Sequence, residues 1–114
     1  MKHSCTAILG VSILTLVVSV ANAANGEGAG LRSCQRYFDD LKKDPNTVDL
    51  YFSWGQGFMS GLNIARLNDA TGGFESMPRQ KQKEYLHNFC ETNPTKNYFD
   101  GVMDLYSVLY PHAK

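Results

Sequence analysis

The chain has 114 residues and balances 11 lysines and arginines against 11 aspartates and glutamates, so its formal net charge at pH 7 is zero. A neutral chain offers no basic face to a phosphate backbone, which excludes nucleic-acid binding driven by electrostatics. The length allows a single domain with a modest hydrophobic core.

The first 23 residues predict a secretory signal peptide. Lys2 supplies a basic head, residues 7–20 form an apolar run, and Ala21-Asn22-Ala23 provides the small residues expected before cleavage. The apolar run is shorter than the roughly 20 residues that span a bilayer. A retained membrane helix is therefore the weaker alternative. We expect a protein released into the bacterial periplasm, with no membrane association after cleavage.

Export also determines the chemistry of the cysteines. Cys5 leaves with the signal peptide, and Cys34 and Cys90 then have one intramolecular pairing in an oxidising compartment. In the chain-entropy model, closing this loop contributes about 4 kcal/mol to stability. The alternatives are two free thiols or an intermolecular bridge. We expect a disulfide between Cys34 and Cys90.

The exported chain begins with a segment that favours disorder. Residues 24–30 carry three glycines and no large apolar side chain, so little offsets the entropy of ordering them. We expect a flexible leader over residues 24–32, followed by a helical domain over residues 33–110.

Two helices are predicted in the first half of this domain. Ser33 is a suitable N-cap, and apolar residues then recur at helical spacing until Asp44-Pro45. A second, longer helix begins at Asn46-Thr47 and continues to about Leu67. The residues expected on its inner face are Val48, Tyr51, Phe52, Met59, Leu62 and Ala65. A loop is expected over residues 68–75, which include Gly72-Gly73.

Two further helices complete the domain. The third begins near Ser76 and Pro78 and ends at Asn93-Pro94, and the fourth runs from residues 95–97 to Pro111. Their expected inner residues are Tyr85, Leu86, Phe89 and Cys90, then Phe99, Val102, Met103, Tyr106 and Leu109. With no alternating strand pattern, we predict an all-α fold. It is a small bundle of four helices in which one disulfide ties the start of the first to the end of the third.

The second helix carries three glycines between Gly55 and Gly61, each costing up to about 1 kcal/mol relative to alanine. Small residues share one face of it and predict close packing against a neighbouring helix of the same chain: Ser53, Gly57, Ser60 and Gly61. The alternative is a surface for self-association or for a partner, built on Trp54 and Phe58.

No motif indicates catalysis. His87 lies three residues before Cys90, but a sulfur in a disulfide is neither a nucleophile nor a metal ligand. Asp39 and Asp40, and the pair Asp100 and Asp104, are interpreted as solvated surface charges. We expect no enzyme activity, no metal and no cofactor.

Three features in combination characterise the chain: Cys34 at the start of the first helix, the segment Trp54–Gly61 in the second, and the sequence FCETNP at the end of the third. Over residues 33–109 the chain resembles the HdeA/HdeB-like small periplasmic proteins. Its Trp-x-x-Gly-Phe and Cys-x-x-Asn-Pro patterns are similar to those of uncharacterised members.

The resemblance implies an all-helical, often dimeric periplasmic protein. It also implies a chaperone that loses structure in acid, exposes apolar surface and holds unfolded clients while its disulfide stays closed. In strong acid the exported chain reaches a charge of about +13, which opposes compactness. We therefore hypothesise an acid-stress holdase whose partners are unfolded periplasmic proteins. The alternative is a rigid module that binds one specific periplasmic partner, as exported immunity proteins do.

Overall fold

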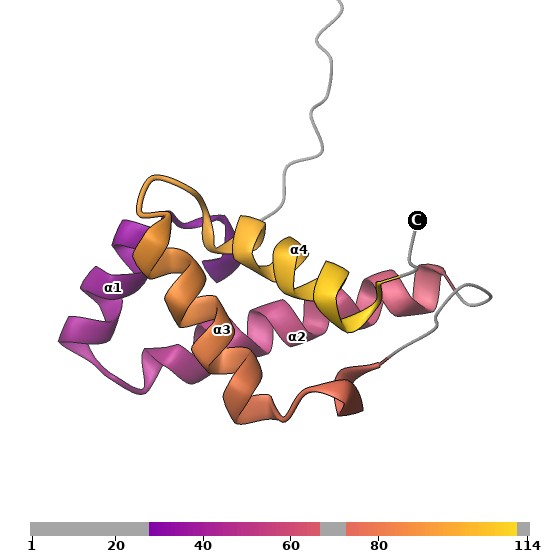
Figure 1. Ribbon diagram of the computed structural model, residues 1–114. Helices are drawn as coiled ribbons and strands as arrows, with labels where there is room; N and C mark the ends of the chain where they lie inside the picture. Colours follow the sequence, from indigo (N-terminus) through magenta and orange to yellow (C-terminus); the bar gives the residue numbers. More distant parts are fainter. Residues whose placement is uncertain (1–27, 67–72, 112–114) are drawn as a thin grey trace, which may run out of the picture.

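The computed structural model describes residues 28–66 and 73–111, which form α1 (Cys34–Lys43), α2 (Thr47–Ala65), α3 (Arg79–Thr92) and α4 (Tyr98–Leu109) (Figure 1). Two short 3-10 helices, η1 (Ala29–Leu31) and η2 (Phe74–Ser76), precede α1 and α3. These ranges contain no β-strand, so the predicted all-α fold with four helices is confirmed. The predicted signal peptide, residues 1–23, lies outside them.

Local capping sets the ends of the helices close to the predicted positions. The Ser33 hydroxyl accepts a 3.1 Å hydrogen bond from the backbone N–H of Arg36 and so caps α1. At the start of α4, the Asp100 carboxylate accepts a 2.9 Å bond from the backbone N–H of Asn97. In Figure 1, α3 crosses in front of α2, and α4 packs against both. No helix in the described ranges is long and apolar enough to cross a membrane.

The predicted disulfide between Cys34 and Cys90 is confirmed. Their Cα atoms lie 4.8 Å apart, and both side chains are fully buried. Backbone hydrogen bonds surround the bridge: the N–H of Cys34 donates to the carbonyl of Lys96 at 2.8 Å, and the N–H of Tyr98 donates to the carbonyl of Arg32 at 3.0 Å. The start of α1, the end of α3 and the start of α4 therefore meet at one end of the molecule.

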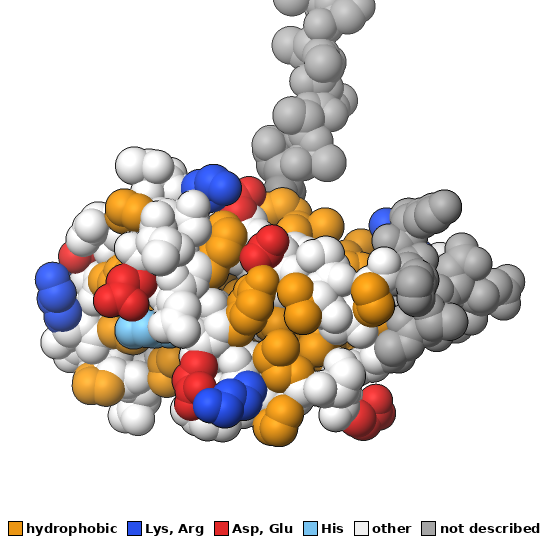
Figure 2. Space-filling view, in the orientation of Figure 1, with side chains coloured by type: hydrophobic (Ala, Val, Ile, Leu, Met, Phe, Trp, Pro, Cys, Tyr) orange, Lys and Arg blue, Asp and Glu red, His pale blue; other side chains and the backbone are white. Residues whose placement is uncertain are grey.

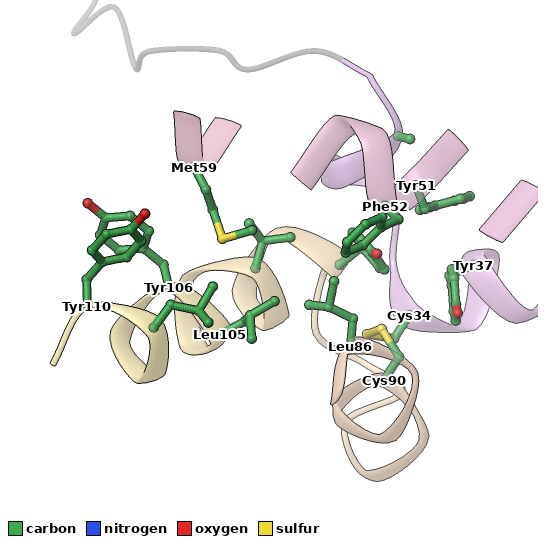
Figure 3. Packing of buried hydrophobic residues seen from close by; sticks show 14 residues of the cluster. Cys34, Tyr37, Tyr51, Phe52, Met59, Leu86, Cys90, Leu105, Tyr106 and Tyr110 are labelled. Carbon is green, nitrogen blue, oxygen red and sulfur yellow. A yellow bond between two sulfur atoms is a disulfide. The ribbon is translucent and has the colours of Figure 1, made fainter. Parts of the chain in front are cut away.

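The hydrophobic core extends from this disulfide to a pair of tyrosines at the far end, as Figure 3 shows. Near the disulfide, the rings of Tyr37, Tyr51 and Tyr98 contact one another with centroids 5.1 to 5.2 Å apart. Burial raises the pKa of Tyr37 to about 12, so its hydroxyl stays neutral in neutral and acidic solution. At the far end, the rings of Tyr106 and Tyr110 lie 4.8 Å apart.

The boundary predicted for the flexible leader is wrong at its C-terminal end. Residues 28–32, called here the N-terminal segment, contact α2 and α4, and Ala29 and Gly30 within it are buried. The prediction considered only composition, and the apolar surface that orders this segment belongs to helices that come later in the chain. Residues 24–27 lie outside the described ranges.

Gly101 is a point of close approach between α4 and α3. A Cβ atom at this position would lie 2.7 Å from Cδ1 of Phe89 and 3.1 Å from Cγ of the same ring. Glycine is therefore required at residue 101 by the packing of the two helices rather than by a special backbone conformation.

Replacing Gly101 by alanine is expected to lower the free energy of unfolding by about 1 to 3 kcal/mol, the usual cost of overpacking a core. Gly57→Ala is the matched control, because no atom lies within 4 Å of a Cβ placed there. Removing a glycine from a helix then leaves stability unchanged or raises it by up to about 1 kcal/mol. Urea unfolding followed by circular dichroism measures both values, and equal effects of the two substitutions would contradict the expectation.

Candidate functional site

Asp40 is the one buried carboxylate in the described ranges, with 7% of its surface exposed. Three groups from three parts of the fold converge on it. Arg32, in the N-terminal segment, lies 2.9 Å from Oδ2, and Arg36, one turn earlier on α1, lies 2.9 Å from Oδ1. The Tyr51 hydroxyl on α2 donates a 2.7 Å hydrogen bond to Oδ2. These four side chains form the Asp40 network.

The Asp40 network stabilises the ionised form of the carboxylate. The hydrogen bond from Tyr51 lowers the pKa of Asp40, the charges of Arg36 and Arg32 lower it further, and burial opposes them. The arginine side chains are themselves 47% and 55% exposed, so the carboxylate is covered mainly by partners that reach water. Loss of its charge would weaken a link between the N-terminal segment, α1 and α2.

The interpretation of Asp40 as a solvated surface charge is wrong, and its neighbour Asp39 differs from it. Asp39 accepts a 3.2 Å hydrogen bond from Gln35 and makes no ion pair in the described ranges. Within α1, the spacing of Arg36 and Asp40 is a signal for an ion pair. The contributions of Arg32 and Tyr51 depend on tertiary packing, which the sequence pattern did not show.

A second feature is an aromatic cluster formed by Trp54, Phe58 and Phe99. Trp54 and Phe58, one turn apart on α2, are stacked with centroids 5.6 Å apart. Phe99 on α4 meets both edge-on, at 6.3 Å from Trp54 and 5.0 Å from Phe58. All three side chains are partly buried. Trp54 and Phe58, the residues predicted as a partner-binding surface, therefore pack against the core and remain partly exposed.

The N-terminal segment lies directly on the Trp54 indole. A Cβ atom at Gly28 would lie 2.8 Å from Nε1 of Trp54, and one at Gly30 would overlap with the six-membered ring. Gly28 also has a φ of 99°, a conformation that favours glycine. Both positions admit only glycine, because the backbone itself contacts the ring.

The prediction that Ser53, Gly57, Ser60 and Gly61 seat a neighbouring helix is wrong for the described part of the chain. Ser53, Gly57 and Gly61 are exposed, and a Cβ at either glycine would meet no atom within 4 Å. The close approach occurs at Gly55, where a Cβ would lie 3.0 Å from Cγ2 of Val102 on α4. Burial of Tyr51 and Met59, four residues before and after Gly55, turns the other small residues outward.

His87 lies on α3 beside a groove in the surface. His87 is partly buried beside an open groove of about 530 Å³ between α1, α2 and α3. The Nδ1 atom of His87 lies 3.3 Å from the Tyr37 hydroxyl. Lys83 and Asp49, which also line the groove, form an ion pair at 2.6 Å. In the described ranges, no three His, Cys, Asp or Glu side chains are grouped so that they could hold a metal ion.

Comparisons with protein-family models, with curated proteins and with solved structures give no match. The Asp40 network and the aromatic cluster are therefore the basis for assigning a function.

Proposed function

We propose that this chain is an exported protein-binding protein that acts as an acid-activated holdase, on the HdeA/HdeB-like pattern. The observation that carries the proposal is the Asp40 network. One buried carboxylate links three separate parts of a small fold, and its two ion pairs require it to be ionised. Acid removes this charge and leaves Arg32 and Arg36 as two cations beside a neutral group.

The surface of the folded protein also supports a role in protein binding. Hydrophobic side chains gather on the face formed by α3 and α4 (Figure 2). On α4, Met103 and Val108 are 37% and 48% exposed, and on α2, Leu50 and Ile64 are 56% and 69% exposed. Opening the fold would add core aromatic side chains to this surface, which provides more area for unfolded clients.

The disulfide limits how far the fold can open in the proposed mechanism. Because Cys34 and Cys90 are linked through a fully buried bond, α1 and α3 stay together when ion pairs are lost. A chain restrained in this way has fewer unfolded conformations to gain and returns more readily to its native state.

An aggregation assay tests the proposal. The oxidised protein, as exported, is mixed with an aggregating client, and light scattering is followed at about pH 2 to 3 and at pH 7. We expect suppression of aggregation in acid and little suppression at pH 7. Asp40→Asn should suppress aggregation at higher pH than the wild type, whereas Asp39→Asn should match the wild type. A lack of suppression at any pH would rule out the holdase.

The alternative of a rigid module for one specific partner depends on Trp54 and Phe58 as a docking surface. Both are partly buried, and the N-terminal segment covers Trp54, which favours the holdase. A fold that remains intact at about pH 3 would favour the rigid module instead.

A further inference from the structure

The N-terminal segment contacts Trp54 in the way a bound peptide would, with its backbone lying against the ring. The segment places backbone and small side chains on an aromatic surface, and its residues Gly28, Ala29 and Gly30 carry no charge. Leu31 follows with 39% of its surface exposed. The covered surface continues from Trp54 into the rest of the aromatic cluster.

The segment is also fastened at the end where it joins the fold. The guanidinium of Arg32 is paired with Asp40, and the carbonyl of Arg32 accepts a 3.0 Å hydrogen bond from the N–H of Tyr98. The groups facing the Asp40 carboxylate are Arg32 from the segment, Arg36 from α1 and Tyr51 from α2. From α4, Tyr98 packs on the ring of Tyr51.

We propose that the aromatic cluster is a peptide-binding surface and that the N-terminal segment is its intramolecular competitor, released when Asp40 is protonated. The inference rests on the proposed holdase function and names its substrate class: extended, uncharged client segments with glycine at the positions that face the ring. Such segments bring backbone against an indole ring without a steric clash, as Gly28 and Gly30 do.

Trp54 makes the proposal directly measurable, because it is the only tryptophan of the chain. Acrylamide quenching of its fluorescence reports how well the ring is covered. In the oxidised wild type, the quenching constant should increase by at least about two-fold between pH 7 and about pH 2, as expected for local opening. Gly30→Ala should reach the higher value already at pH 7, because the added methyl group overlaps with the indole.

Two variants keep the comparison clear. Gly57→Ala lies on the same helix as Trp54 but meets no atom, so its quenching should equal that of the wild type at both pH values. Arg32→Gln removes the ion pair without a steric clash and should raise quenching at pH 7 even if Gly30→Ala fails to fold. Circular dichroism confirms that each variant retains its helices.

The binding step is tested with a capped, uncharged Gly-Ala-Gly-Leu peptide, the sequence of residues 28–31, at roughly millimolar concentration. It should reduce Trp54 quenching in folded Gly30→Ala, or in Arg32→Gln if Gly30→Ala does not fold, and have less effect on the wild type at pH 7. The same peptide with both glycines replaced by alanine should bind less well.

Either of two results would overturn the inference: unchanged quenching in a folded Gly30→Ala or Arg32→Gln protein, or no difference between the peptides. Aggregation suppression at about pH 2 by a wild type whose Trp54 stays covered at that pH would reject the inference and leave the holdase in place. Trp54 exposure and peptide binding without aggregation suppression would support the peptide surface and reject the holdase.

Discussion

Replacing both Cys34 and Cys90 by alanine should lower the free energy of unfolding by about 4 kcal/mol, within the usual range for a long disulfide loop. The bond joins residues 56 positions apart and restricts the unfolded chain strongly. A loss of this size approaches the whole stability of many small domains. Urea unfolding at pH 7, followed by circular dichroism, measures the change.

The wild type after reduction is the control for packing, because its thiols fill nearly the same volume as the disulfide. Reduced wild type and the double alanine variant should have similar unfolding midpoints, both well below that of the oxidised protein. If only the variant were destabilised, loss of buried volume rather than loss of the cross-link would be the cause.

Asp40→Asn should remove the contribution of this buried carboxylate to the pH dependence of stability. The pKa of Asp40 is lowered in the folded state, so ionisation stabilises the fold above the unfolded-state value of about 4. This stabilisation is lost as the pH falls through the folded-state pKa. The variant should therefore be less stable than the wild type at pH 7, and the two should converge in strong acid.

Asp39→Asn provides the matched control at the neighbouring position, because its hydrogen bond from Gln35 involves no cation. It should leave both the stability at pH 7 and the slope against pH close to those of the wild type. Unfolding midpoints in urea, measured between about pH 2 and pH 7, give these slopes. Equal slopes for wild type and Asp40→Asn would show that other carboxylates govern acid unfolding.

Much of the fold could be predicted because its signals are local. The start of the first helix is marked by capping at Ser33. The ends of two helices are marked by proline, which lacks an N–H, at Asp44-Pro45 and Asn93-Pro94. The predicted signal peptide contains Cys5, which leaves one possible pairing, between Cys34 and Cys90. Each of these predictions depends on residues near one another in the sequence or on the number of cysteines. None of them depends on how the helices are rotated about their axes.

The candidate site was predicted less well because helix rotation and tertiary partners determine it. The spacing of small residues in α2 predicted close packing at Gly57 and Gly61. The buried face instead contains Gly55, together with Tyr51 and Met59. On α4, Met103 was expected in the core but is 37% exposed. Apolar spacing identifies a helix more reliably than it identifies which of several small or apolar residues point inward.

Gly28 and Gly30, which cover Trp54, lie only a few residues before Cys34 in the chain. This short tether determines how tightly another peptide must bind to displace them. Gly30 is only four residues from a covalently anchored position, so it meets the indole at an effective concentration in the millimolar range or above. A free peptide must exceed that local concentration, or bind more tightly, before it gains access. The tether thus sets an affinity threshold that excludes weak ligands and makes return of the segment independent of protein concentration.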